Sequence, residues 1–176
     1  DVSNPSAIVA TDAFTHENLL YPGGVDTFTI GTKTYAIVTG YYADTVQIFN
    51  VSNPANIVVT DTETDDANGF DELEGAFGVN VFTVGSSTYA IVTGYSDDGV
   101  QIIDVSDPTN MIAVDSLTNS GSLKLKGADG VDTFNIGFTK YAIVAAVETY
   151  GENDGGVQII QLSTDISYFV KDQTIP

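Results

Sequence analysis

A motif that occurs three times constrains the fold of this chain more than any other feature. Its middle copy runs from Tyr89 to Pro108 and is typical of two short strands, an acidic turn and a corner that ends in proline. The other two copies begin with the same Tyr-Ala-Ile-Val run, at Tyr35 and Tyr141. Repetition at a spacing of about 50 residues is the signature of solenoids, propellers and arrays. We therefore interpret the chain as a repeat architecture before assigning any local structure.

Each repeat is predicted to hold four short strands, named A to D in chain order. β-branched and aromatic residues crowd these runs, and Gly and Pro separate them. Strand A covers residues 24–30, 78–84 and 130–136; strand B begins at Tyr35, Tyr89 and Tyr141; strand C begins at Val46, Val100 and Val157; strand D covers residues 57–60, 111–114 and 166–170. A further D strand, residues 7–10, precedes them. We divide the chain into residues 1–13, the end of a preceding repeat, and three repeats over residues 14–64, 65–118 and 119–176.

Strand B indicates how these units pack. In its first copy Tyr35, Ile37 and Tyr41 lie on one face and Ala36 and Val38 on the other, so both faces are apolar. Such a sheet has to be covered on both sides. Four-stranded antiparallel meanders that cover one another are the blades of a β-propeller. We predict an all-β fold of three propeller-type blades plus one extra N-terminal strand, open unless other chain segments or copies complete it. A parallel β-helix, whose coils are shorter, is the alternative.

The repeated pattern resembles a known family. Gly-Val-Asp-x-Phe at residues 24–28, Tyr-Ala-Ile-Val at residues 89–92 and Gly-Val-Gln-Ile-Ile-Asp-Val-Ser-Asp-Pro at residues 99–108 are similar to the LVIVD-type repeat of secreted and cell-surface β-propeller proteins. The resemblance covers nearly the whole chain and departs from the pattern at residues 161–164, where the Asp-Val-Ser-Asn-Pro corner is lost. It implies an extracellular or cell-surface location and a binding or structural role without catalytic residues.

The charge balance excludes several kinds of partner. The chain carries 24 acidic and 5 basic residues, which gives a net charge of −19, and none of the basic residues is arginine. Because phosphate binding needs clustered Lys and Arg, we expect no nucleic-acid partner, and an anionic membrane surface is disfavoured for the same reason. No run approaches the length of about 18 apolar residues that membrane insertion requires. We expect a protein or glycan at a cell surface, or copies of this chain, as partners.

The number of repeats does not determine how the chain assembles. Propellers close with about four to eight blades, so three units and one extra strand do not close alone. The chain begins at Asp1 in the middle of a repeat, and we expect a processed product or a fragment of a longer polypeptide. Three arrangements follow: part of a larger propeller or array, a ring made by two copies, or a fibre in which residues 7–10 pair with the edge of another chain.

Strand parity places the variable loops together on one face. These are the D-to-A loops, residues 12–23, 61–76 and 115–129, together with the B-to-C loops. The second of the D-to-A loops is strongly acidic, and carboxylate and amide oxygens with flexible glycines between them suit Ca²⁺. The candidate ligands are Asp65, Asp66, Asn68, Asp71, Glu72 and Glu74. Their spacing does not match an EF-hand, and an ordinary solvated acidic loop is the alternative.

Other polar and aromatic positions also stand out. Asp26, Asn80 and Asp132 share one place in strand A, where they either tie neighbouring elements together or form a polar ring at the mouth of the central channel. Asn50 begins an Asn-Val-Ser sequon for N-glycosylation. Packing between blades is assigned to the repeated aromatic residues Phe28, Phe82, Phe134, Tyr35, Tyr89 and Tyr141.

The sequence alone does not favour an enzyme. The chain has one histidine, His16, and no cysteine, which excludes a histidine-based metal centre and a thiol nucleophile. Carboxylates suffice for glycoside hydrolysis, but the usual Trp and Arg groups that stack on and clamp sugars are missing. We therefore expect a non-catalytic extracellular segment with a structural, adhesive or surface-assembly role, whose acidic loop face binds cations or a partner. The alternative is a calcium-dependent carbohydrate-binding or carbohydrate-processing domain.

Overall fold

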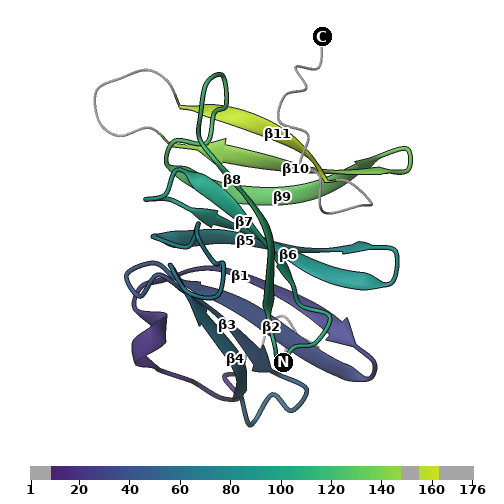
Figure 1. Cartoon of the computed structure of the whole chain (residues 1–176). Coiled ribbons are helices and arrows are strands. Elements are labelled where there is room, and N and C mark those ends of the chain that lie inside the picture. The colour runs from purple at the N-terminus through teal and green to yellow at the C-terminus, as the bar shows by residue number, and fades with distance from the viewer. Residues whose placement is uncertain (1–8, 148–154, 163–176) are drawn as a thin grey trace.

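The computed structural model describes residues 9–147 and 155–162, which form antiparallel sheets (Figure 1). The strands are β1 (Pro22–Ile30), β2 (Lys33–Gly40), β3 (Thr45–Asn50), β4 (Val58–Thr64), β5 (Ala76–Val84), β6 (Ser87–Gly94), β7 (Gly99–Asp104), β8 (Ile112–Thr118), β9 (Ala128–Ile136), β10 (Thr139–Ala146) and β11 (Gly156–Leu162). Within these ranges the only helix is the short 3-10 helix η1 (Glu17–Leu19), and no helix there could span a membrane. The predicted all-β fold is confirmed.

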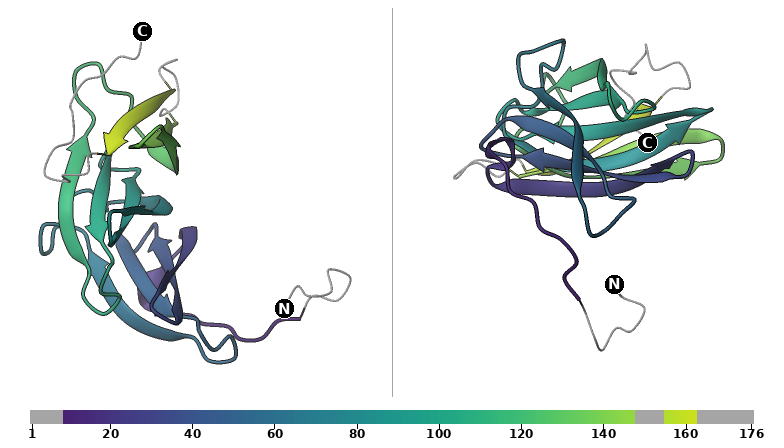
Figure 2. Two further views of the ribbon diagram at one scale, coloured as in Figure 1. Left: turned by 90° about the vertical axis from the view of Figure 1, so that its right-hand side faces the viewer. Right: turned by 90° about the horizontal axis from the view of Figure 1, so that it is seen from below.

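Each sheet is a meander whose strands follow chain order. The first sheet holds β1 to β4, the second holds β5 to β8, and the described part of the third holds β9 to β11. These sheets, called blades 1, 2 and 3 below, stack in a curved row in which β1, β5 and β9 are neighbours (Figures 1 and 2). This is the arrangement of β-propeller blades, whose first strands line the central axis.

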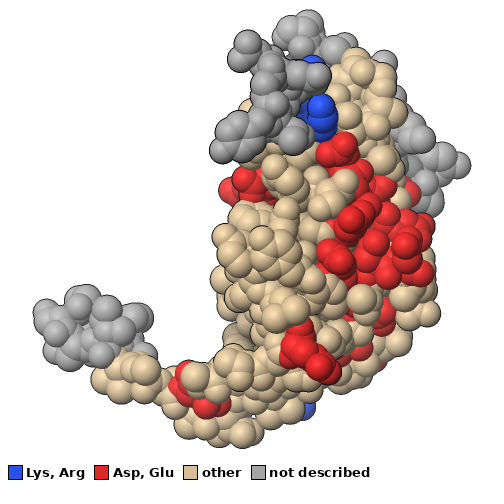
Figure 3. Space-filling model, turned by 90° about the vertical axis from the view of Figure 1, so that its left-hand side faces the viewer, with Lys and Arg blue, Asp and Glu red and all other residues tan. Residues whose placement is uncertain are grey.

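The strand ends form two opposite faces. The loop face carries the connections between blades, residues 65–75 and 119–127, and the turns at residues 41–44 and 95–98. The hairpin face carries the two-residue turns that follow β1, β5 and β9, in each of which a glycine adopts the positive φ that a tight turn needs. Asp and Glu side chains gather in a broad band on the loop face (Figure 3). The prediction that the variable loops share one face is therefore met by the described loops.

Two apolar cores lie between the blades. The first combines Ile37, Val46 and Ile48 of blade 1 with Ala90, Val92 and Ile103 of blade 2; the second combines Ile91, Val100 and Ile102 of blade 2 with Ala142, Val144 and Ile160 of blade 3. All of these side chains are buried. Because full burial of one aliphatic side chain contributes about 1.5–3 kcal/mol, the blades stabilise one another rather than themselves.

Hydrogen bonds also join the inner strands. Thr39 Oγ1 donates to the carbonyl oxygen of Phe77 at 2.6 Å, and Thr93 Oγ1 donates to the carbonyl oxygen of Asp129 at 2.6 Å. Gly78 is required at the second joint, because a Cβ there would collide with the Asp129 carbonyl oxygen. The threonine near the end of β2 and of β6 thus holds each inner strand against the next one. In blade 3 the position of the two threonines is taken by Ala145.

The repeated Phe and Tyr residues pair inside each blade. The ring centroids of Phe28 and Tyr35, of Phe82 and Tyr89, and of Phe134 and Tyr141 lie 5.6, 5.7 and 5.6 Å apart, each across the first two strands of one blade. Packing between blades was the prediction, and it describes only part of their role. Phe28, Tyr35 and Phe82 do border the inter-blade cores.

Two predicted D strands fall wholly or partly outside the described residues. The D strand of the third repeat, residues 166–170, lies outside them. Of the extra strand at residues 7–10, Val9 and Ala10 are described, and they belong to no strand of this chain. They form part of an extended arm that leads away from the blades (Figure 2).

Candidate functional site

The polar positions of strand A join the inner strands. Asp26, Asn80 and Asp132 are each the central residue of a 9-residue strand, so they lie at mid-strand rather than at a channel mouth. Asp26 Oδ2 accepts the N–H of Val81 at 2.7 Å. Asn80 Nδ2 donates to Asp132 Oδ1 at 3.1 Å, and its Oδ1 accepts the Thr133 hydroxyl at 2.8 Å. Of the two roles considered for these residues, the hydrogen bonds correspond to tying neighbouring strands together.

Two aspartates organise the loop face. Asp44 and Asp98 occupy equivalent places in the turns that follow β2 and β6, and both have positive φ. Asp44 Oδ1 accepts the N–H of Gly75 at 2.8 Å, and Asp98 Oδ1 accepts the N–H of Gly127 at 2.7 Å. Gly75 and Gly127 also have positive φ, which suits glycine. The turn of one blade therefore fixes the loop that leads into the next blade.

An aromatic hollow of about 330 Å³ opens between these turns. Its lining residues are Tyr21, Tyr41, Tyr42, Phe77, Tyr95, Asp129 and Val147. All three blades contribute, because Tyr41, Tyr95 and Val147 each follow the second strand of a blade. Phe77 and Asp129 come from the loop-face ends of β5 and β9. The hollow thus lies where the inner strands of the three blades begin.

Tyr41 is the centre of this aromatic hollow. Its ring centroid lies 5.9 Å from Tyr21, 5.0 Å from Tyr42, 6.0 Å from Phe77 and 5.9 Å from Tyr95, with interplanar angles of 60–89°. Edge-to-face pairs of this kind stabilise by about 0.5–1.5 kcal/mol each, so the rings hold one another in place. Burial raises the pKa of the Tyr41 hydroxyl above its ordinary value. Tyr41 is therefore a neutral hydrogen-bonding group at physiological pH.

Asp129 supplies the carboxylate of the hollow. Its backbone is held by Thr93, and its side chain is half-buried. Burial raises the pKa of the Asp129 carboxyl group above its ordinary value. The equivalent positions of β1 and β5 hold Gly23 and Phe77, so the three units place different chemistry at one end of the channel. A carboxylate in an apolar wall can accept hydrogen bonds from ligand hydroxyl groups and is a stronger base than a solvated one.

Two apolar residues anchor the acidic loop, residues 65–75. Phe70 and Leu73 are 1% and 0% exposed and belong to the core between blades 1 and 2. Glu72 is carried inward between them and is 4% exposed. One of its oxygens accepts the Thr118 hydroxyl, and Oε2 has no hydrogen-bond partner among the described residues. Burial, reinforced by the charge of Asp97, raises the pKa of Glu72 to about 7.

The structure does not bring the other predicted calcium ligands together. Asp65 Oδ1 accepts the N–H of Leu73 at 2.9 Å, and Asn68 Nδ2 donates to Glu63 at 3.2 Å. Asp66, Asp71 and Glu74 are exposed. Within residues 9–147 and 155–162, no three acidic or histidine side chains gather closely enough to hold a metal ion. Calcium binding therefore stays a prediction from the sequence.

Asp97 is a further, half-buried carboxylate beside this loop. Its Oδ2 accepts the N–H of Glu74 at 2.7 Å. Burial raises the pKa of Asp97 to about 6 in spite of that hydrogen bond. Glu72 is buried under the loop and Asp97 donates no group to the hollow, whereas Asp129 is among the residues that line it, so Asp129 is the carboxylate of the hollow.

Asn50 ends β3 at the hairpin face. Its Oδ1 accepts the N–H of Ser52 at 3.0 Å, which closes a turn of the kind that Asn favours. N-glycosylation at Asn50 stays a prediction.

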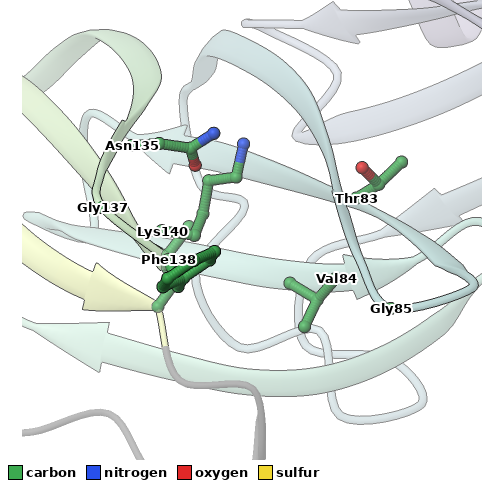
Figure 4. Close-up of a pocket in the computed structure, with 8 residues that line it drawn as sticks. Thr83, Val84, Gly85, Asn135, Gly137, Phe138 and Lys140 are labelled. Atoms are coloured by element: carbon green, nitrogen blue, oxygen red, sulfur yellow. The ribbon is translucent and has the colours of Figure 1, made fainter.

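A second hollow, of about 300 Å³, lies on the hairpin face between blades 2 and 3 (Figure 4). Lys140 faces Asn135 across β9 and β10, and the two side chains lie side by side above the fully exposed Phe138. None of its lining residues is acidic. It therefore provides an aromatic position outside the Tyr41 hollow for control variants.

Comparisons with known proteins bear on the fold. No protein-family model and no curated protein matches this sequence, so the resemblance to LVIVD-type repeats stays a prediction. Solved structures do match. An exo-β-1,3-galactanase from Phanerochaete chrysosporium, solved with β-1,3-galactotriose, has a TM-score of 0.57 at 14% identity, over 93% of this chain and 40% of that one.

Two further neighbours have similar scores. The GH32 β-fructofuranosidase of Bombyx mori has a TM-score of 0.56 at 9% identity, over 86% of this chain and 36% of that one. An α-L-arabinofuranosidase from Lactobacillus brevis has a TM-score of 0.53 at 9% identity, over 82% and 49%. This chain spans less than half the length of each of the three. At these identities the likeness shows the fold alone.

These neighbours correct the functional expectation. The predictions of a non-catalytic structural or adhesive segment, and of no enzyme, are overturned because the fold is shared with enzymes that act on carbohydrates. The alternative was a calcium-dependent carbohydrate-binding or carbohydrate-processing domain; these neighbours agree better with its carbohydrate part, and its dependence on calcium stays a prediction. The prediction failed because it counted absent residue types. Glycoside hydrolysis uses carboxylates rather than His or Cys, and tyrosine rings offer the flat surface for which Trp was sought.

The hollow itself was not predicted from the sequence. Tyr41 was placed on an apolar face of strand B, and Tyr95, Phe77 and Asp129 were not singled out. One signal was present: the second residue of the first strand changes from Gly23 to Phe77 to Asp129, while the residues that follow are nearly constant. Variation at one position of a repeated scaffold marks a site of recognition.

Proposed function

We propose that the aromatic hollow binds a saccharide and that this chain is a segment of a carbohydrate-processing β-propeller protein. The observation that carries the proposal is the meeting of tyrosine rings with the half-buried carboxylate of Asp129 where the inner strands begin. The fold shared with solved carbohydrate-active enzymes supports it.

The lining of the hollow suits a sugar ring. A sugar has apolar C–H faces and a rim of hydroxyl groups, and a tyrosine side chain has an apolar body and a polar tip. Tyr42 is exposed, and Tyr41 and Tyr95 are half-buried, so ring surface remains open to a ligand. A volume of about 330 Å³ is at the small end of ligand sites, which favours a short saccharide or the terminal unit of a glycan.

Asp129 is the polar anchor in this proposal. A carboxylate accepts strong hydrogen bonds from two neighbouring sugar hydroxyl groups. Hydrolysis of a glycoside needs a pair of carboxyl groups about 5–9.5 Å apart. The described lining holds one carboxylate, Asp129, and we assign it as one member of such a pair. The second member then lies outside this lining, so binding is the property that the segment can be tested for directly.

Calorimetric titration tests the binding. β-1,3-galactotriose, a β-fructofuranoside and an α-L-arabinofuranoside are the probes, because the neighbours named above are enzymes of those classes. We expect one of them to bind, and Tyr95→Ala to weaken the affinity at least about tenfold, or 1.4 kcal/mol. Phe138→Ala, which removes an exposed ring on the hairpin face, is the matched control and should bind as the original chain does. Binding of none of the probes, or equal losses in both variants, would contradict the proposal.

Product release tests the carboxylate. Where the chain releases sugar from its bound saccharide, Asp129→Asn should lower the rate at least about a hundredfold, as expected for the loss of a catalytic carboxylate. Glu74→Asn, at an exposed carboxylate of the acidic loop, is the control. Full activity in the Asp129→Asn variant would show that Asp129 is not a catalytic residue.

A further inference from the structure

Tyr21 stands where the other two blades have glycine. Its carbonyl oxygen accepts the N–H of Tyr41 at 3.1 Å. The residues that accept the equivalent bond in blades 2 and 3 are Gly75 and Gly127. The φ angles of Tyr21, Gly75 and Gly127 are 55°, 67° and 63°, a region that suits glycine and is unfavourable for a bulky side chain. The fold requires no side chain at this position, and unfavourable backbone angles of this kind are typical of functional sites.

The Tyr21 ring adds little to the core. Its side chain is 62% exposed, and Tyr42, whose ring centroid lies 5.2 Å away, is 68% exposed. Both residues line the aromatic hollow. Exposed apolar rings that gather around a hollow are characteristic of binding sites. The position of the Tyr21 ring is thus explained by a ligand and not by folding.

The rings of the hollow stand at steep angles to one another. The rings of Tyr21, Tyr42, Phe77 and Tyr95 make interplanar angles of 63°, 75°, 89° and 60° with Tyr41. A flat sugar ring stacks on one aromatic face at a time, whereas a compact group can contact several rings set at such angles. The face of an aromatic ring carries partial negative charge and attracts a cation within about 6 Å of its centroid. Grouped rings of this kind are suited to an organic ammonium group.

The charges around the hollow also favour a cation. Its lining includes the carboxylate of Asp129, and none of its described lining residues is basic. Burial raises the pKa of the Asp129 carboxyl group, and none of the described residues contributes a charge or a hydrogen bond to that shift. A cation beside a buried carboxylate favours its ionised form. The band of Asp and Glu side chains on the loop face attracts positively charged ligands and repels negatively charged ones (Figure 3).

We propose that the saccharide of the aromatic hollow is an amino sugar, whose ammonium group lies among the rings beside Asp129. This inference rests on the proposed function, because the ammonium group belongs to the saccharide bound there. The ammonium group donates hydrogen bonds to the carboxylate, and hydrogen bonds between two charged groups are about twice as strong as those between neutral groups. A neutral sugar stacks on the same rings but lacks this charged contact, so it binds more weakly.

Three sugars that differ only at C2 test the role of the charge. At about pH 6, D-galactosamine carries an ammonium group there, N-acetyl-D-galactosamine a neutral amide and D-galactose a hydroxyl group. Calorimetric titration should give galactosamine at least about tenfold higher affinity than either neutral sugar. Equal affinity for galactosamine and galactose would overturn the amino sugar and leave the proposed function standing.

Tetramethylammonium separates the two proposals further. It has no hydroxyl group, so its binding depends on the rings and the negative charge alone. We expect it to bind and to displace galactosamine from the hollow. Failure to displace galactosamine would overturn the placement of the ammonium group among the rings. Binding of tetramethylammonium together with no binding of any sugar would contradict the amino sugar and the proposed function alike.

A charge-removing variant tests the contact with Asp129. Asp129→Asn keeps the size of the side chain, so it should lower the affinity for galactosamine at least about tenfold and that for galactose by no more than about threefold. Glu74→Gln removes one charge from an exposed position of the loop face and is the matched control. It should change the affinity for galactosamine less than about twofold. Equal losses in the two variants would assign the attraction to the overall negative charge and overturn the proposal.

Tyr21→Gly tests the ring without disturbing the blades. The variant should fold as the original chain does, because glycine is the residue of the other two blades at this position. We expect its affinity for tetramethylammonium and for galactosamine to fall at least about threefold, with the loss of one ring face. Phe138→Ala, which removes an exposed ring on the hairpin face, is the control and should bind both as the original chain does. Unchanged affinity in a folded Tyr21→Gly variant would overturn the proposal.

Discussion

The hydroxyl group of Thr93 donates a 2.6 Å hydrogen bond to the carbonyl oxygen of Asp129, in the neighbouring blade. The same hydroxyl oxygen accepts the N–H of Gly78 at 2.7 Å. Thr93 is fully buried, so both bonds are protected from water. One side chain thus connects the joint between blades 2 and 3 to the backbone of Asp129, whose carboxylate lines the aromatic hollow.

Replacing Thr93 with Val should remove the hydrogen bonds that hold the backbone of Asp129 in place. The substitution leaves the Asp129 carbonyl and the Gly78 N–H without their partner, which costs about 1–3 kcal/mol of unfolding free energy. We also expect saccharide affinity to fall about threefold to tenfold, or up to 1.4 kcal/mol, because Asp129 is less well positioned. Chemical denaturation and calorimetry measure the two effects.

Thr39→Val is the matched control for this prediction. Thr39 makes the equivalent bonds, to the Phe77 carbonyl and the Gly24 N–H, at the joint between blades 1 and 2. It should lose similar stability but less saccharide affinity than Thr93→Val, because the residue that it holds, Phe77, contributes a ring to the hollow and not the carboxylate. Equal loss of affinity in the two variants would show that the effect on binding is not specific to Asp129.

The buried Glu72 should make stability fall as pH rises. Burial raises its pKa to about 7, so the folded chain holds this proton at pH values where the unfolded chain releases it. The folded state then binds more protons, and the unfolding free energy decreases between about pH 4.3, the ordinary pKa of Glu, and about pH 7. Thermal unfolding from pH 4 to pH 8 measures this slope. Asp97, whose pKa is raised to about 6, contributes to the same decrease at the lower pH values of this range.

Glu72→Gln should remove most of that dependence. The amide needs no proton to be neutral, so we expect the variant to gain about 1–3 kcal/mol at pH 8 and to match the original chain near pH 4. Glu74→Gln removes the same charge from an exposed position of the same loop and serves as the control. An equal gain in both variants would assign the slope to the overall negative charge instead of to burial.

The missing side chain of Gly99 leaves the space that the buried Glu72 carboxyl group occupies. A Cβ at Gly99 would collide with Glu72 Oε2, whereas a Cβ at Gly130 meets open space. Gly99→Ala should therefore cost about 1–3 kcal/mol, and Gly130→Ala should change stability by less than about 0.5 kcal/mol.

A double-mutant cycle identifies the cause of that cost. Glu72→Ala combined with Gly99→Ala should lose less stability than the sum of the two single variants, because the colliding atom is gone. Denaturation curves of the four proteins measure the difference. Strict additivity would show that Glu72 is not what Gly99 accommodates.

Much of the fold could be predicted because each local signal agreed with the repeat. The apolar residues on both faces of strand B required cover on both sides, and Ile91 and Ala90 do enter different cores. The inter-strand role of Asp26 was among the alternatives considered for strand A. A residue type that recurs at the same position of every repeat has the same structural role in each blade, so these roles could be inferred from the sequence.

The candidate site resisted prediction for the opposite reason. Tyr21, Phe77 and Asp129 stand at positions that the other repeats fill with different residues, so only that variation marks them and no repeated motif does. These residues lie close together only because the row of three blades is curved, which brings the loop-face ends of their inner strands near one another. Likewise, the burial of Glu72 follows from its anchors, Phe70 and Leu73, in a loop whose composition suggested solvent.

Saturation-transfer NMR shows whether a saccharide stacks on the rings of the aromatic hollow. With β-1,3-galactotriose as the probe, irradiation of the aromatic protons of the chain should attenuate the sugar C–H signals. We expect this transfer to be lost in a folded Tyr41→Ala, Tyr95→Ala double variant and kept in Phe138→Ala. Transfer that persists unchanged in the double variant, or that disappears in Phe138→Ala, would contradict this expectation.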